Sequence, residues 1–207
     1  QFPLRQSCKG FRKEISIYDN AKVHEKADVI LKVDLLKFYD TITEKRVYGI
    51  FKAMGYVENL AYSLAKLCTA RHRYSYWDDF DEQSKKVLYR LVEEKPPILP
   101  QGAPTSPMLA NIAATNMDKR FEALALKMKF NYSRYADDLT FSIIKGGELP
   151  SLKLITRIVN NEHFFINPDK VNYMKKGSKQ YVTGLTTTNG VNVSKNKRKE
   201  IAEHIYY

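Results

Sequence analysis

Two adjacent carboxylates, Asp137 and Asp138, lie between two segments rich in strand-forming residues. Tyr132 and Tyr135 precede them, and apolar and small polar side chains alternate after them, so residues 130–144 are predicted to form a hairpin with the acidic pair at its turn. Two neighbouring negative charges in a largely apolar setting stay ionised only if a cation or a basic group compensates them. The pair is therefore a candidate cation site, and an ordinary Asp-Asp hairpin turn is the alternative.

A third carboxylate, Asp34, follows an apolar run from Val29 to Val33 that only Lys32 interrupts. The run predicts a buried strand that delivers Asp34 at its carboxyl end. Because a buried Asp without a partner is costly, an acid in this place is a candidate functional residue. A turn or helix-capping role is the alternative.

Helical patterns account for much of the remaining chain. Thr43 is predicted to cap a helix that runs to Met54, and Ser106 to cap a helix that Pro107 starts. The other predicted helices are a short one beginning at 16–20, one within 57–76 with Leu60, Leu64 and Leu67 on one face, the continuation of the Pro107 helix to 128, and 152–159.

Loops and short strands are predicted between these helices. The segment from Trp77 to Glu82 contains a second acidic pair, Asp78 and Asp79. Because no strand pattern flanks these two acids, we interpret them as a solvated loop, with a metal-binding role as the alternative. Residues 83–95 are expected to be a surface connection. Residues 181–185 and 191–193 are predicted to form short strands around turns, followed by a basic run that leads into a helix.

The composition favours a polyanionic partner, because 34 basic and 23 acidic residues give a net charge of +11. The 207 residues suffice for one domain or a little more. Cys8 and Cys68 lack metal-ligand spacing and are interpreted as reduced structural thiols. We find no run of membrane-spanning length and no signal peptide, so we expect no membrane partner and a cytoplasmic location.

Five segments occur in the order found in bacterial reverse transcriptases. They are Asp34 after its strand, QGAPTSP at 101–107, YADD at 135–138, Asn167 with Lys170, and VTGL at 182–185. These motifs are spread across nearly the whole chain, which therefore resembles this family. It is most similar to the retron and related phage-defence types. The resemblance implies an α+β fold, a right-hand polymerase palm with an RRM-like or ferredoxin-like antiparallel sheet backed by helices.

The resemblance also implies a division of the chain. Residues 1–193 would form fingers and palm, with the fingers at approximately 1–27 and 57–100, and residues 194–207 would start the thumb. The chain begins without Met and ends just after a basic run, so we expect it to be a piece of a longer protein with further finger and thumb segments.

The implied activity is RNA-directed DNA polymerisation, in which an RNA template, a DNA or RNA primer and deoxynucleoside triphosphates are the partners. Nucleotide addition uses two divalent ions about 3.5–4 Å apart, and hard oxygen ligands suit Mg²⁺, with Mn²⁺ as a substitute. Asp34 and Asp137 would bridge both ions, the backbone carbonyl of Leu35 would contact the nucleotide-bound ion, and Asp138 would be a weaker ligand.

Other positions take their roles from the family motifs. Tyr39 stands where the family has the side chain that excludes ribonucleotides. Gln101 and Gly102 belong to the motif under the templating base and incoming nucleotide, and Gly184 to the segment that grips the primer end. Lys170 would neutralise the departing pyrophosphate.

The chain departs from the family near its start. In the family's GF-x-x-x-R-S segment an Arg precedes the Ser and helps to grip the triphosphate, whereas this chain has Ile15 before Ser16. Arg12 or Lys13 would then substitute. The alternatives are an inactive nucleic-acid-binding module of the same fold, a group II intron, diversity-generating or template-independent polymerase, and a generic ferredoxin-like domain without catalysis.

Overall fold

The computed structural model describes residues 4–205, and these divide into two compact units. The first unit comprises residues 4–5, Leu35–Lys119 and Leu152–Asn167, and the second comprises Gln6–Asp34, Arg120–Ser151 and residues 168–205. In chain order the elements are α1 (Ile17–Lys22), β1 (Val29–Asp34), α2 (Glu44–Ala53), α3 (Glu58–Cys68), α4 (Tyr74–Asp78), α5 (Glu82–Val87), α6 (Tyr89–Glu94), α7 (Ser106–Ala113), α8 (Thr115–Met128), β2 (Asn131–Tyr135), β3 (Asp138–Ile143), α9 (Leu152–Asn161), η1 (Pro168–Lys170), β4 (Asn172–Lys175), β5 (Tyr181–Val182), β6 (Leu185–Thr186), β7 (Asn192–Val193) and α10 (Lys195–Ile205).

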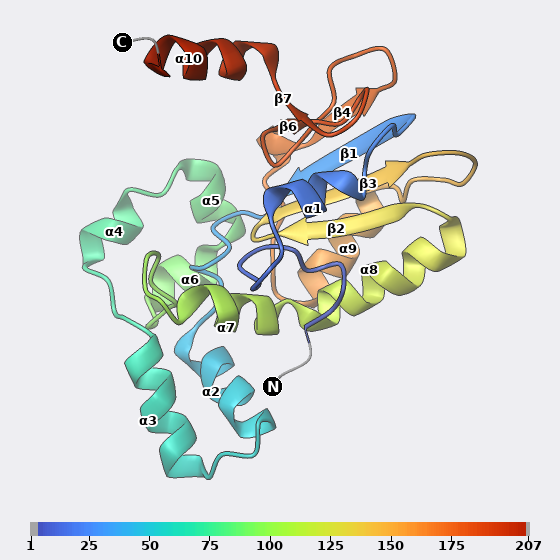
Figure 1. The fold of residues 1–207 in the computed structure, drawn as a ribbon. Coiled ribbons are helices and arrows are strands. Elements are labelled where there is room, and N and C mark those ends of the chain that lie inside the picture. Colours follow the sequence, from blue (N-terminus) through green and yellow to red (C-terminus); the bar gives the residue numbers. More distant parts are fainter. Residues whose placement is uncertain (1–3, 206–207) are drawn as a thin grey trace. The chain divides into compact units, whose positions relative to one another are not determined.

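The second unit is built on a four-stranded antiparallel sheet with the order β2-β3-β1-β4 (Figure 1). The predicted hairpin of residues 130–144 is confirmed as β2 and β3, and the predicted apolar strand is β1 in the centre of the sheet. Helices together with an antiparallel sheet confirm the predicted α+β class.

The two faces of this sheet carry different side chains because alternate residues point to opposite sides. On one face the ring of Phe121 from α8 packs against Tyr132 and Phe141, with ring centroids 5.0 and 5.1 Å away. On the other face, the buried imidazole of His24 bonds to the hydroxyls of Ser133 and Ser142. One face is therefore an apolar core, and the other includes a buried polar group.

A small sheet, β5-β6-β7, completes the second unit before α10. The predicted short strands at 181–185 and 191–193 are confirmed. Thr183 and Gly184 connect β5 to β6 with φ values of 46° and 81°. Positive φ at both central residues is typical of a tight hairpin turn and explains a glycine at the second position. A core of Ala21, Ala27, Ile30, Met174 and Val182 lies in this unit.

The first unit is helical, and two sequence predictions within it are wrong. Asp78 and Asp79 are exposed, as predicted, but they do not form a loop, because Asp78 is the last residue of α4 and Asp79 is its C-cap. Trp77 and Phe80 beside them are buried. Residues 83–95 are not a plain surface connection but form α5 and α6. The aromatic pair and Leu88 pack with Leu36 and Ile98, which lie far away in the sequence.

The predicted helices are present, with three corrections. The helix within 57–76 ends at Cys68 and buries Ala61, Ala65 and Cys68, whereas Leu60 and Leu67 are exposed. The helix started by Pro107 is interrupted at Ala114, giving α7 and α8. Ser106 is not a cap but the first residue of α7, and its hydroxyl donates to the carbonyl of Pro100 at 2.7 Å.

Thr43 occupies the predicted N-cap position of α2, although its side chain makes no capping hydrogen bond. The predicted amphipathic helix at 152–159 is α9, and the predicted short helix is α1, where Ser16 and Asp19 form a capping box. Within residues 4–205, no helix combines the length and the apolar character needed to cross a bilayer.

Candidate active site

The three predicted acids of the second unit meet at one end of its sheet. Asp34, the last residue of β1, pairs in register with Asp138, the first residue of β3. Directly paired residues on antiparallel strands share a face, so these two carboxylates lie on the same side. Asp137 is in the turn between β2 and β3, immediately before Asp138. The structure therefore brings together acids from distant parts of the chain.

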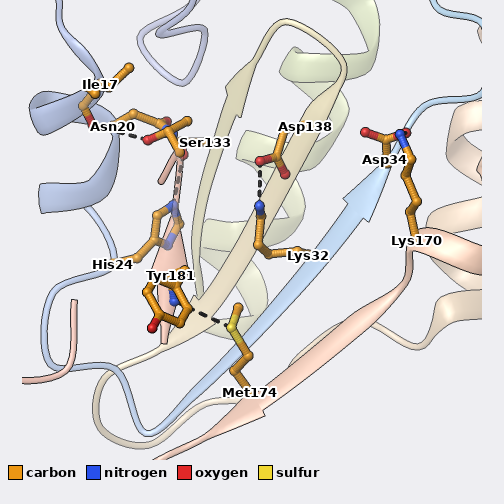
Figure 2. A network of polar contacts seen from close by, with 11 residues as sticks. Ile17, Asn20, His24, Lys32, Asp34, Ser133, Asp138, Lys170, Met174 and Tyr181 are labelled. Carbon is orange, nitrogen blue, oxygen red and sulfur yellow. Dashed lines mark hydrogen bonds and ion pairs between the residues drawn. The ribbon is translucent and has the colours of Figure 1, made fainter. Parts of the chain in front are cut away.

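Each of the two paired acids accepts a bond from a lysine (Figure 2). The ammonium of Lys32 lies 2.7 Å from Asp138 Oδ2, and that of Lys170 lies 3.0 Å from Asp34 Oδ2. Lys32 reaches the acids because it is two residues before Asp34 on β1 and shares its face. Basic groups thus compensate the charges of Asp34 and Asp138. A basic group was one of the two kinds of partner, beside a cation, that we expected for the carboxylates.

Lys32 was not among the residues predicted for the site. The sequence does hint at such a role. Lys32 is the only charged residue inside the apolar run, and it lies two residues before Asp34, so the two side chains point to the same face of a strand. Lys170 was predicted to meet the leaving pyrophosphate, and here it contacts Asp34.

The electrostatics of the site reflect burial and crowding. Burial raises the pKa of Asp137, and the nearby charge of Asp34 raises it further. Burial also raises the pKa of Asp138, while the contact with Lys32 opposes that rise. The hydrogen bond to Asp34 raises the pKa of Lys170. Repulsion among the carboxylates adds to this effect of burial, and a cation placed among them would relieve that repulsion.

The donor set suits a divalent ion in kind, because three carboxylates gather where their charges interact. Across residues 4–205, however, no group of three His, Cys, Asp or Glu side chains stands ready to hold a metal. The ion pairs with Lys32 and Lys170 occupy one oxygen each of Asp138 and Asp34. An ion that binds to either of these oxygens would have to displace the lysine paired with it.

A buried polar chain lies on the same face of the sheet (Figure 2). Ser133 Oγ donates to Asn20 Oδ1 at 2.7 Å, so it must accept from His24 Nε2–H at 2.8 Å. Ser142 Oγ then donates to His24 Nδ1 at 2.7 Å. Burial lowers the pKa of His24 to about 3, so the ring is neutral near pH 7. Asn20 Nδ2 also donates to Thr183 Oγ1 at 3.5 Å, and this contact extends the row of hydrogen bonds to the turn of the VTGL segment.

The remaining predicted site residues are divided between the two units. Gly184 is exposed in the β5–β6 turn, and Arg12 donates from Nη1 to the carbonyl of Cys8 at 3.1 Å, both in the second unit. In the first unit, Tyr39 packs edge-on against Phe38 with ring centroids 5.5 Å apart.

Three further predicted residues also belong to the first unit, where Leu35 is buried and forms a bridge with Ile166. Gln101 and Gly102 are exposed in the loop before α7. The binding roles predicted for Leu35, Tyr39, Gln101 and Gly102 stay predictions, as do those of Arg12 and Gly184.

Comparison with known proteins gives matches along most of the chain. The family model described as reverse transcriptase (RNA-dependent DNA polymerase) matches residues 3–199. Retron Mx162 reverse transcriptase of Myxococcus xanthus is 38% identical over 196 residues, which are 89% of this chain and 39% of the relative. Retron Mx65 reverse transcriptase of the same organism is 34% identical over 205 residues, 97% of this chain and 46% of the relative.

Retron Ec86 reverse transcriptase of Escherichia coli is 31% identical over 200 residues, 96% of this chain and 55% of the relative. The chain thus spans between 39% and 55% of the length of these three relatives. Among solved structures, apo telomerase from Candida tropicalis aligns over 86% of this chain and 34% of its own, at 14% identity and a TM-score of 0.49, too low a similarity to argue from. Because the family model covers nearly the whole chain, the chain belongs to the reverse transcriptase (RNA-dependent DNA polymerase) family.

Proposed function

We propose that the protein to which this chain belongs is a retron reverse transcriptase, which adds deoxynucleotides to the 3′-hydroxyl of a primer on an RNA template. The family match and the names of the relatives support the reaction and the retron assignment. The observation that carries the proposal is the meeting of Asp34, Asp137 and Asp138 at one end of the sheet.

In this proposal, Asp34 and Asp137 hold two Mg²⁺ ions, with Mn²⁺ as a substitute, and the backbone carbonyl of Leu35 contributes beside Asp34. Such ions would stabilise charge on the attacking and leaving oxygens of an in-line phosphoryl transfer. Asp138 contributes less, because its Oδ2 is held by Lys32. Rigid strands fix these acids, which keeps their positions defined without substrate.

The lysines act as resident counter-charges in the proposed cycle. Lys32 is on the central strand and has a side chain only 25% exposed, so it stays near Asp138 and limits that acid's share of the ions. Lys170 has a side chain 62% exposed, so it can leave Asp34 and approach the departing pyrophosphate. One lysine is therefore a fixed partner and the other an exchangeable one.

Binding of the template and primer would depend on phosphate contacts. The net charge of +11 favours a nucleic-acid partner, and the basic helix α10 follows the small sheet. Phosphate contacts make binding weaken steeply as salt rises. The preference for deoxynucleotides is assigned to Tyr39, so Tyr39→Ala should raise ribonucleotide incorporation, and unchanged discrimination would remove Tyr39 from this role.

The decisive experiment is a primer-extension assay with the complete protein, homopolymer RNA and DNA templates, and Mg²⁺. We expect extension on RNA templates that Asp137→Ala abolishes. Asp78→Ala is a matched control, because Asp78 also directly precedes a second acid but is exposed in the other unit. Equal extension by wild type and Asp137→Ala would contradict the proposal.

A second candidate is a nucleic-acid-binding module of the same family without catalysis. The lysine-paired acids favour it, since they leave no ready metal group among the described residues. Retained template binding with no extension by the complete wild-type protein would select it. A retron role further requires an adjacent gene for a structured RNA, and a role in phage defence predicts loss of protection when Asp137 is replaced.

A further inference from the structure

Gly10 lies against the turn that carries Asp137. A Cβ atom added at Gly10 would lie 2.7 Å from the backbone nitrogen of Ala136 and 3.3 Å from two backbone atoms of Tyr135. Gly10 is not among the residues with positive φ, so the need for glycine here comes from space and not from backbone conformation. The atoms it would meet are backbone, which cannot swing aside as a flexible side chain can.

The residues around Gly10 form a strap, defined here as Ser7–Phe11, along the outer strand of the sheet. The N–H of Lys9 donates to the carbonyl of Arg134 at 2.8 Å, and the N–H of Arg134 donates to the carbonyl of Ser7 at 2.8 Å. These bonds form a parallel bridge between Cys8 and Arg134 on β2, which is an edge strand. The strap is thus built into the sheet beside the hairpin.

Arg134 connects the strap to the turn from inside the fold. Its side chain is completely buried, and it donates from Nη1 to the carbonyl of Ala136 at 2.9 Å. Its Nη2 donates to Cys8 Sγ, which is also buried, at 3.3 Å. Ala136 has a φ of 55°, a conformation that a residue with a side chain holds only when its surroundings fix it.

We propose that the strap and Arg134 position the turn that presents Asp137, so that Gly10, Cys8 and Arg134 are positioning residues for the proposed polymerase reaction. Gly10 packs beside the backbone nitrogen of Ala136, and Arg134 binds the carbonyl of the same residue. Asp137 follows directly, so both contacts set the direction in which its carboxylate leaves the turn. The inference rests on the proposed function only for its effect on rate.

This assignment gives the early glycine-containing segment a role other than gripping a triphosphate. Arg12, the residue predicted to replace the family's arginine, donates to the carbonyl of Cys8 within the strap. Phe11 directly follows Gly10 in the sequence, and the centroid of its ring lies 6.1 Å from that of Tyr135. Both residues therefore add to the contacts that hold the strap beside the hairpin.

The test compares Gly10→Ala with Gly49→Ala in the complete protein. Gly49 is a matched control, because a Cβ there meets nothing within 4 Å. We expect Gly10→Ala to speed amide exchange across residues 131–138 at least about tenfold and to lower kcat about 10- to 100-fold, with KM for the nucleotide nearly unchanged. The amide exchange rate, kcat and KM of Gly49→Ala should each stay within about twofold of the wild-type value.

The exchange measurement needs no activity, so it separates failure of this inference from failure of the proposed function. If wild type does not extend primers, the exchange result alone decides on the strap. Exchange and kcat of Gly10→Ala equal to those of Gly49→Ala would overturn the inference. A merely structural role would lower stability while leaving kcat unchanged well below the melting temperature.

If Gly10→Ala does not fold, a pair of substitutions at Cys8 takes its place. Cys8→Ser keeps an acceptor for Arg134, whereas Cys8→Val removes it at similar size. We expect faster exchange at 131–138 and a several-fold lower kcat for Cys8→Val, and recovery of both in Cys8→Ser. Two Cys8 variants that both behave as wild type would overturn the role of the Arg134 contact.

Discussion

Two kinds of carboxylate environment can be compared in this chain. In the first unit, Asp40 is 1% exposed and accepts a hydrogen bond from the hydroxyl of Tyr76 at 2.8 Å. In the second unit, Asp34 and Asp138 are partly exposed and accept from lysine ammonium groups. Asp40 is buried in the helical unit with a neutral hydroxyl as its partner. The other two acids have charged lysine partners, of which Lys170 is the more exposed.

The difference indicates which acids can exchange their partner. Burial raises the pKa of Asp40, and the ring of His72 stacks on Tyr76 with centroids 4.1 Å apart, so Asp40 is enclosed. A lysine can give up a carboxylate to a divalent cation, because both carry positive charge and the acid keeps a counter-ion. Asp40 is thus part of the fold, and the sheet-end acids are suited to bind ions.

The largest effect is expected for Asp137→Asn, which would break the sheet-end site. Loss of one ion-holding carboxylate should remove several kcal/mol of transition-state stabilisation, or about a thousandfold in the rate of primer extension. The rate is measured with the complete protein at saturating Mg²⁺. Asp40→Asn should leave the rate within about tenfold, and a larger loss in Asp40→Asn than in Asp137→Asn would reverse the comparison.

The second effect concerns stability and tests the other side of the comparison. Tyr76→Phe removes the hydroxyl bonded to Asp40 and leaves a buried acid without that partner, which costs about 1–3 kcal/mol. Urea denaturation measures the loss. Tyr74→Phe is the control, since Tyr74 is 74% exposed, and equal stability of the two variants would show that the Asp40 contact contributes little.

The third effect sharpens the idea of exchange. Lys32→Met removes the positive charge that competes for Asp138, so Mn²⁺ should bind about fivefold more tightly, equivalent to about 1 kcal/mol. Mn²⁺ binding is followed by electron paramagnetic resonance. The matched control is Lys176→Met, whose ammonium pairs with Asp28 at 3.2 Å elsewhere in the same unit. Weaker Mn²⁺ binding in Lys32→Met would mean that this lysine supports the ion instead of competing with it.

The smallest effect is a pH dependence. Because the folded-state pKa of Asp137 is raised, its contribution favours folding at pH below its ordinary value of 3.8 and is lost as pH rises through the raised value. Asp137→Asn should therefore gain stability relative to wild type between about pH 4 and pH 7, by about 1 kcal/mol or less. Chemical denaturation at several pH values without divalent ions measures this, and a relative loss over that range would give the wrong sign.

The sheet and its acids could be predicted because their signals are local. The alternation after Asp138 and the apolar run before Asp34 each define a strand, and both strands exist. The sequence order of the motifs then indicated that the two ends meet. The register that pairs Asp34 with Asp138 was not predicted and is given by the structure.

The errors came from contacts between residues far apart in the sequence. Asp78 and Asp79 were assigned to a loop because no strand pattern flanks them, yet Trp77 and Phe80 on either side of them pack with Leu36 and Ile98. On α3, the small residues Ala61 and Ala65 are buried, while the larger Leu67 is exposed. Small side chains allow close helix packing against α2, and hydrophobicity alone favours the wrong face.

The sequence motifs also did not predict that lysines pair with Asp34 and Asp138. Lys32 was noted only as an interruption of an apolar strand, and its contact with Asp138 depends on the pairing of β1 with β3. The buried Arg134 and the close approach of Gly10 depend on the path of the strap beside β2. Such contacts need the three-dimensional arrangement, since no spacing in the sequence encodes them.

The most direct measurement is an anomalous difference map from Mn²⁺-soaked crystals of the complete protein with a primer and template. We expect Mn²⁺ peaks within ligand distance of Asp34 and Asp137, with Lys170 moved away from Asp34. Both lysines still paired with their acids at saturating Mn²⁺, with no peak at the end of the sheet, would contradict it.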